Sequence, residues 1–340
     1  MRTLVLDRPG SLTLTDTHPP EDPGPGMALV RVLRVGVCGT DIHAWHGRQP
    51  FFTYPRILGH ELAVEVLATG PGVANVREGD RCAVEPYLNC GVCRPCRLGR
   101  GNCCERMQVL GVHLDGGLRE RIAVPARKLH PSSRIDAESL ALVEMLSVGA
   151  HAVARARPSA DDTVLVIGAG PIGLGVAAFA VQSGASVTIG DVNPSRLAFC
   201  RERAGFQSVI DLSGDPANAV HAAYGGELPS IVFDATGNAA SMQAAFRLVA
   251  NAGTLVFVGL VLGDLSFEDR DFHRRETTLL ASRNALPEDF RQVMAALESG
   301  RIDVRPWITH RARLEDGVEA FASWTRPDSG VLKAMILVSG

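Results

Sequence analysis

The 340-residue sequence lacks a strong net charge, long apolar runs and an N-terminal targeting pattern. Its formal net charge is −3, and it has no basic arm or run of like charges, so we expect no nucleic-acid partner. The longest apolar run, GLGVAAFAV, is too short to cross a bilayer, so we expect no membrane span. The first ten residues, MRTLVLDRPG, have no charged-then-apolar signal pattern, which favours a cytoplasmic location.

Internal repeats and low-complexity segments are also missing, but the residue pattern changes once along the chain. Up to about residue 158, short β-branched runs broken by proline and glycine predict a β-rich region. From residue 163, apolar runs alternate with alanine-rich helical patterns, which predicts a doubly wound parallel sheet with helices on both faces. The six expected strands are 163–168, 186–191, 208–212, 230–236, 253–260 and 277–282.

The two patterns predict an α/β protein with two domains. We expect 151–282 to form the doubly wound domain, inserted into a discontinuous β-rich domain made of 1–150 and 283–340. A helix over 287–300 should open the second part of the β-rich domain.

Eight cysteines in such a chain argue for metal binding or chemistry rather than for disulfides. Cys90, Cys93, Cys96 and Cys104 follow the spacing C-x2-C-x2-C-x7-C, which is typical of a closed structural zinc site with four thiolates. Cys103 is an alternative fourth ligand, and the spacing favours Cys104. A ferredoxin-like iron–sulfur cluster also fits this spacing, but nothing else in the sequence indicates electron transfer.

A glycine-rich turn follows the first strand of the doubly wound region, in the segment VLVIGAGPIGLG. It comprises Gly168, Gly170, Pro171, Ile172 and Gly173. The first glycine permits the tight turn, the second lets a pyrophosphate approach the backbone, and the third lets helix and strand pack closely. The helix that begins near Pro171 offers amide donors and partial positive charge to that pyrophosphate.

Asp191 ends the next strand, about 20 residues further along, where a carboxylate binds the hydroxyls of a cofactor ribose. The same carboxylate would repel a 2′-phosphate, so the sequence favours NAD over NADP. Arg196 has two possible roles. It either lies over the adenine or tolerates a 2′-phosphate, and the second role would permit NADP.

A second candidate metal site is spread over three segments: GVCGTDIH, GHE and ALVEML. They supply Cys38, His60, Glu61 and Glu144. Cys38, His60 and one carboxylate would give zinc three protein ligands and one open position, as in a catalytic site.

These motifs together resemble the zinc-dependent medium-chain dehydrogenases of the alcohol, polyol and threonine dehydrogenase group. GVCGTDIH, GHE, the four-cysteine segment and GAGPIGLG occur in that family's order and spacing over essentially the whole chain. The resemblance implies a GroES-like β-rich domain, a Rossmann NAD-binding domain, and two zinc ions, one catalytic and one structural. Glu144 stands where simple alcohol dehydrogenases have a second cysteine. The polyol branch of the family has a glutamate there. Whether Glu61 or Glu144 binds the catalytic zinc directly, or whether they exchange, stays open.

The resemblance also implies roles for the residues after Cys38. Zinc would act as a Lewis acid that lowers the pKa of the substrate hydroxyl. Thr40 would accept the hydroxyl proton, and His43 would pass it toward solvent. Asp41 would orient the ring of His60.

The substrate is expected to be a sugar acid or a polyol, because several segments beyond the metal and cofactor motifs resemble dehydrogenases of L-galactonate-like sugar acids. Arg48, Arg119 and Arg283 are candidates to bind the carboxylate. A threonine or simple alcohol dehydrogenase is the alternative within enzymes, and a non-catalytic NAD-binding regulator is the alternative of another class. We also expect a homodimer or homotetramer.

Overall fold

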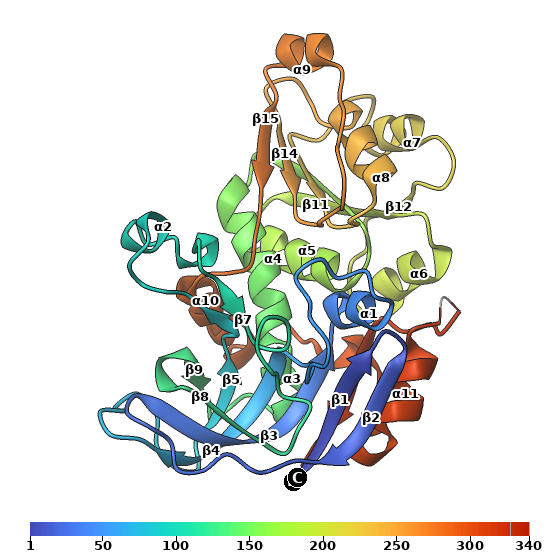
Figure 1. Cartoon of the computed structure of the whole chain (residues 1–340). Helices are drawn as coiled ribbons and strands as arrows, with labels where there is room; N and C mark the ends of the chain where they lie inside the picture. The colour runs from blue at the N-terminus through green and yellow to red at the C-terminus, as the bar shows by residue number, and fades with distance from the viewer. Residues whose placement is uncertain (327, 340) are drawn as a thin grey trace. The chain divides into compact units, whose positions relative to one another are not determined.

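The computed structural model describes residues 1–326 and 328–339 and divides into two compact units (Figure 1). Unit 1 comprises Met1–Glu144 and Leu286–Gly340, and unit 2 comprises Met145–Ala285. In the part of the chain that the structure describes, no helix is both long and apolar enough to cross a membrane.

Unit 1 is built on a seven-stranded sheet whose strands come from both ends of the chain. Its order is β16-β17-β3-β4-β5-β9, and β8 pairs with β3 beside this path. The strands are β3 (Met27–Val37), β4 (Glu61–Thr69), β5 (Arg81–Val84), β8 (Arg121–Pro125), β9 (Leu129–Pro131), β16 (Ile308–Arg313) and β17 (Lys333–Leu337). The alternating apolar residues of β3 and β4, such as Val30, Val32, Val64 and Val66, are fully buried. Burying each of these side chains contributes about 1.5–3 kcal/mol.

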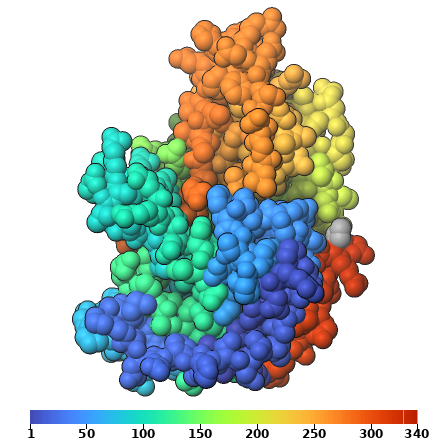
Figure 2. Space-filling model, in the orientation of Figure 1, coloured from blue at the N-terminus to red at the C-terminus, as the bar shows by residue number. Residues whose placement is uncertain are grey.

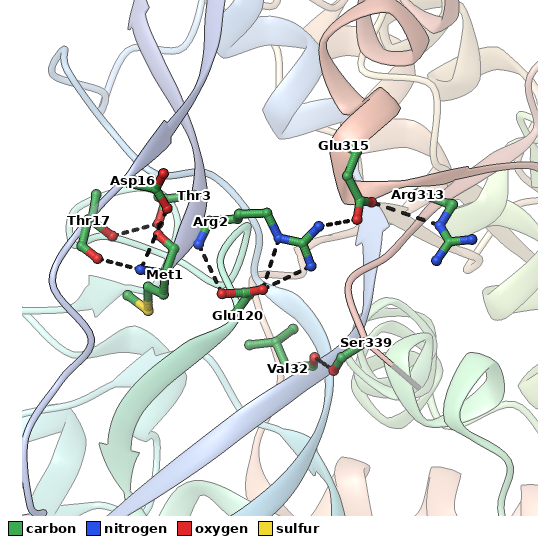
Figure 3. Close-up of polar contacts among 10 residues, drawn as sticks. All are labelled: Met1, Arg2, Thr3, Asp16, Thr17, Val32, Glu120, Arg313, Glu315 and Ser339. Atoms are coloured by element: carbon green, nitrogen blue, oxygen red, sulfur yellow. Dashed lines mark hydrogen bonds and ion pairs between the residues drawn. The ribbon is translucent and has the colours of Figure 1, made fainter.

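The first strands of the chain, β1 (Arg2–Arg8) and β2 (Ser11–Asp16), form a hairpin that polar contacts hold to the rest of unit 1 (Figure 3). Arg2 bridges two carboxylates: its Nε donates to Glu120 at 3.0 Å, and its guanidinium also pairs with Glu315. The terminal ammonium of Met1 donates to the carbonyl oxygen of Thr17 at 2.7 Å. The hairpin is thereby linked to both sequence segments of unit 1.

Unit 2 is a six-stranded parallel sheet with the strand order β12-β11-β10-β13-β14-β15. The strands are β10 (Thr163–Ile167), β11 (Ser186–Asp191), β12 (Val209–Asp211), β13 (Ile231–Asp234), β14 (Thr254–Phe257) and β15 (Thr278–Ala281). The helices of this unit are α5 (Pro171–Gln182), α6 (Pro194–Glu202), α7 (Pro216–Ala223), α8 (Ala239–Ala244) and α9 (Asp269–Arg275). Each of the six predicted strands is present, and the order is that of the doubly wound dinucleotide-binding fold.

Candidate active site and metal centres

Cys38, His60 and Glu61 lie together where β3 and β4 meet in unit 1. Cys38 directly follows β3, and Glu61 begins β4 directly after His60. The antiparallel register places Gly36 opposite Glu61. The possible ligand atoms of the three residues, a sulfur, an imidazole nitrogen and a carboxylate oxygen, all lie within 4.8 Å of one another. This donor set fits a zinc ion with three protein ligands and one open position.

Lys333, at the start of β17, is a member of this site that the sequence analysis missed. Its ammonium donates to Glu61 at 2.6 Å and to the carbonyl oxygen of Val37 at 3.0 Å, and its side chain is buried. Burial favours the neutral amine, but the negative charges of Glu61 and Cys38 outweigh it and raise the pKa of Lys333. The available signal was one lysine within the apolar run VLKAMILV.

Glu144 is buried but lies outside the group formed by Cys38, His60 and Glu61. Its carboxylate accepts a hydrogen bond from the hydroxyl of Tyr87, another residue that the sequence analysis missed. Burial raises the pKa of Glu144, against the opposing influence of His60. Glu61 is therefore the carboxylate grouped with the thiol and imidazole, and Glu144 is held by a phenol.

Asp41 contacts both Cys38 and His60. Its Oδ2 accepts the backbone amide of Cys38 at 2.9 Å at the start of α1 (Gly39–Trp45), and its Oδ1 lies 3.7 Å from Nδ1 of His60. The second distance is that of an ionic contact and is too long for a hydrogen bond. Burial lowers the pKa of His60, but Asp41 and Cys38 outweigh burial, and the pKa is raised well above its ordinary value.

Thr40 and His43 lie on the same short helix α1 as Asp41. Thr40 is half-buried and His43 is exposed. The pKa of His43 is lowered by partial loss of water and then by the positive charges of Arg48 and His46. The imidazole therefore stays neutral, and able to accept a proton, to lower pH than a free histidine.

The four cysteines of the predicted structural site, Cys90, Cys93, Cys96 and Cys104, come together on one loop of unit 1. The segment that contains them, 90–104, projects from the surface in Figure 2, where it is coloured teal. Their sulfur atoms lie within 4.8 Å of one another. Backbone amides point at these sulfurs: Cys90 donates to Cys104 at 3.3 Å and Cys93 donates to Cys90 at 3.4 Å. Amides of Val92 and Cys93 lower the pKa of Cys90 to about 6, which favours the thiolate that zinc requires. Cys103 is exposed and is not in this group.

The glycine turn of unit 2 has the geometry that its sequence predicts. Gly168 has φ of +102°, a conformation that L side chains rarely adopt. A Cβ atom at Gly173 would lie 1.8 Å from the carbonyl oxygen of Gly168, so only glycine permits this close approach of helix and strand. Gly170 caps α5, and Pro171 and Ile172 open it.

Asp191 ends β11 beside this turn. Its Oδ2 accepts the backbone amide of Ala169 at 2.6 Å, and its Oδ1 accepts that of Asn193 at 2.8 Å. The carboxylate therefore also braces the glycine turn. Arg196 lies on α6, and its Nη1 is 3.0 Å from where a Cβ atom of Gly170 would be. A guanidinium thus lies directly at the glycine turn.

The two candidate arginines of unit 1 differ in how their donors are used. Arg119 donates from Nε to the carbonyl oxygen of Gly116 at 3.0 Å and from Nη2 to that of Asp115 at 3.4 Å. It therefore holds its own loop. Arg48 is exposed, and no hydrogen bond or ion pair joins its guanidinium to a residue that the structure describes. Arg283 belongs to unit 2.

The fold and these sites define a zinc-binding dehydrogenase, and comparison with known proteins shows that the chain belongs to that family. Residues 24–134 match the alcohol dehydrogenase GroES-like domain, and residues 171–299 match the zinc-binding dehydrogenase domain. The predicted fold class and family are therefore confirmed.

Among individual proteins, the chain is 44% identical to L-galactonate-5-dehydrogenase of Escherichia coli K12, over 92% of this chain and 91% of that protein. It is 35% identical to L-arabinitol 4-dehydrogenase of Hypocrea jecorina, over 92% and 85% of the two chains. A solved structure of an alcohol dehydrogenase from E. coli CFT073 with NADH superposes with a TM-score of 0.93 at 29% identity, covering 99% of both chains. A dehydrogenase from Sinorhizobium meliloti bound to NADP gives 0.92 at 28% identity, again over 99% of both chains.

Proposed function

We propose that this protein oxidises a secondary hydroxyl of a sugar acid of the L-galactonate type to a ketone, with NAD as the hydride acceptor. The observation that carries the proposal is the group of Cys38, His60 and Glu61 in a chain that matches L-galactonate-5-dehydrogenase along nearly its whole length. A related polyol is the second candidate, favoured by the match to L-arabinitol 4-dehydrogenase.

In this proposal, residues of unit 1 bind the catalytic metal and transfer the proton. Cys38, His60 and Glu61 would hold the catalytic zinc, with Glu144 as a fourth group near it. A bound zinc ion supplies the Lewis acid that makes the substrate hydroxyl easier to deprotonate. Thr40 takes that proton and His43 passes it to solvent. Partial loss of water, and then the positive charges of Arg48 and His46, lower the pKa of His43 and favour its neutral form.

The other sites serve stability and cofactor binding. Cys90, Cys93, Cys96 and Cys104 would hold a structural zinc ion, which stabilises a protruding loop with little core of its own. In unit 2, the glycine turn would bind the cofactor pyrophosphate and Asp191 the ribose hydroxyls. Because Asp191 also accepts two backbone amides, its position is fixed before the cofactor binds.

The test is NADH formation by the purified protein with L-galactonate, other aldonates, L-arabinitol, threonine and ethanol, in parallel with NADP. The proposal expects the highest kcat/KM for L-galactonate or a related aldonate with NAD. Preference for L-arabinitol supports the polyol candidate, and preference for threonine or ethanol contradicts both. A folded, NAD-binding protein inactive with every alcohol would indicate the non-catalytic regulator.

We also propose a homo-oligomer in which the edge strand β15 of one copy pairs with that of another. β15 ends the sheet of unit 2, and Leu279 on it is 38% exposed; Leu260 and Leu262, which follow β14, are 65% and 62% exposed. Exposed apolar strand edges favour pairing with another chain. Light scattering should give at least a dimer, and Leu279→Lys should lower the mass. None of the eight cysteines, all of which the structure describes, is in a disulfide, and the proposed zinc sites need thiolates. Both features favour the reducing cytoplasm as the location of this protein.

A further inference from the structure

Tyr87 lies between two sites that the proposed function treats as separate. It belongs to β6 (Tyr87–Leu88), which pairs with β7 (Gln108–Val109) in a two-stranded sheet. These two strands carry the chain into and out of the segment that contains the four cysteines. Tyr87 is three positions before Cys90, the first cysteine of the group, and its backbone pairs with Val109, five positions after Cys104, the last.

The segment between Tyr87 and Cys90 is itself anchored to the cysteine group. The side chain of Asn89 donates from Nδ2 to the sulfur of Cys96 at 3.6 Å. The same amide group packs against Gly101, where a Cβ atom would lie 3.3 Å from Nδ2. The arrangement of the four sulfurs therefore constrains where β6 lies.

The other end of Tyr87 reaches the catalytic centre. Its side chain is 4% exposed, and its hydroxyl donates to Oε1 of Glu144, which is 6% exposed. Among the residues that the structure describes, Tyr87 is the hydrogen-bond partner of this carboxylate. The ring packs edge-on against Phe290, with centroids 6.2 Å apart, so the phenol has little freedom to move away. A buried carboxylate with one fixed donor is oriented by that donor.

We propose that Tyr87 is a positioning residue that holds Glu144 in a fixed orientation at the catalytic metal site and transmits to it the arrangement of the cysteine group. With its hydroxyl bound to Oε1, Tyr87 takes up part of the carboxylate's capacity to bind a metal and keeps Glu144 as a neighbour of the Cys38–His60–Glu61 group. Without that hydroxyl, Glu144 is free to become an additional metal ligand. The proposal rests on the proposed function for the identity of the metal site.

The test uses the cobalt(II)-substituted holoprotein, because the visible absorption of cobalt(II) weakens when its coordination number rises from four. Tyr87→Phe removes only the hydroxyl and should weaken that absorption while metal content stays at two per chain. It should also lower kcat by about tenfold or more, the loss expected for a hydrogen bond to a charged group, with the KM for NAD unchanged. Tyr224→Phe is the matched control, since that hydroxyl donates to a backbone carbonyl in unit 2 at 2.9 Å. A Tyr87→Phe spectrum and kcat equal to those of the control would overturn the proposal.

Two double variants separate positioning from a general loss of structure. If Tyr87 acts through Glu144, adding Tyr87→Phe to Glu144→Gln should leave the spectrum of Glu144→Gln unchanged; a further change of equal size contradicts this. Asn89→Ala should change the spectrum in the wild-type background and not in the Tyr87→Phe background. Asn75→Ala is its control, because that amide donates to Ala126 away from both sites. An equal effect of Asn89→Ala in both backgrounds would overturn transmission through Tyr87.

The spectra need no sugar substrate. Absence of sugar-acid oxidation would therefore reject the proposed function and leave the result for Tyr87 intact, while unchanged spectra would reject the role of Tyr87 alone.

Discussion

Gly36 lies directly against the carboxylate of Glu61. The two residues are paired across β3 and β4, and a Cβ atom on Gly36 would lie 2.0 Å from Oε2 of Glu61. Lys333 holds the same carboxylate from β17 at 2.6 Å. Glu61 therefore lies between a glycine that leaves space for it and a buried lysine that fixes its charge.

Replacing Gly36 with alanine should displace the Glu61 carboxylate and weaken metal binding at the catalytic site. We expect a loss of affinity of about tenfold or more, as for other changes that misplace a metal ligand. Titration of the apoprotein with zinc, followed by metal analysis, measures it. Gly39→Ala is the control, because a Cβ atom there would meet nothing within 4 Å. Equal zinc affinity in the two variants would show that Glu61 does not need this space.

The sequence predicted the local features of the fold, but it did not predict the long-range contacts of Glu61 and Glu144. The six strands of unit 2 and the glycine turn follow from apolar runs and local glycine requirements, which neighbouring residues determine. Lys333 and Glu61 are 272 positions apart, and Tyr87 and Glu144 are 57 apart. The first pair depends on which strands lie beside β3 in the large sheet of unit 1. The second joins β6, in a separate two-stranded sheet, to the helix α4 (Val143–Ala156). Short, irregularly spaced β-runs do not encode either arrangement.

We predict two zinc ions per chain. Cys38→Ala should lose the catalytic ion and keep its fold, because β3 and β4 are held by their own core. Cys93→Ala should lose the structural ion and unfold at a lower temperature, since the cysteine loop has few buried apolar residues and exposes Val92 (60%) and Leu98 (63%). Metal analysis and thermal unfolding measure both effects.

Cys200→Ala is the control for these two variants, because Cys200 is buried in unit 2 and outside both groups; burial raises its pKa to about 11. Unchanged zinc content in Cys38→Ala would contradict the catalytic site.

Asp191→Ser should raise the KM for NAD by roughly tenfold to a hundredfold, because charge-assisted hydrogen bonds to the ribose contribute about 1.5–3 kcal/mol each. It should also reduce discrimination against NADP. Because the carboxylate accepts the amides of Ala169 and Asn193, the variant should lose some thermal stability as well. Asp211→Ser is the control, since Asp211 ends the adjacent strand β12 and accepts the amide of Ser213 in the same way. If the wild type already prefers NADP, Arg196 becomes the residue to test.

Arg48→Ala should shift the acid limb of the kcat/KM profile to higher pH. Partial loss of water is the largest cause of the lowered pKa of His43, and the positive charge of Arg48 lowers this pKa further because it disfavours the imidazolium. Loss of that charge raises the pKa of His43. Because the proposed proton relay needs the neutral imidazole, activity should decline sooner as the pH falls. An identical acid limb in the wild type and the variant would show that His43 takes no part in the proton transfer.

The same arginine should distinguish an acid from a neutral substrate. Arg48 follows the helix that carries Thr40 and His43, and its guanidinium has no protein partner among the described residues, whereas the Nε and Nη2 donors of Arg119 are engaged by its own loop. Arg48 is therefore the better candidate for a substrate carboxylate. In Arg48→Ala, we expect the KM for L-galactonate to rise about tenfold, with a smaller change in kcat and little change for a neutral polyol of matched stereochemistry. Arg127→Ala, another exposed arginine of unit 1, should change neither substrate's KM. An equal rise in KM for the acid and the polyol would mean that Arg48 does not recognise the carboxylate.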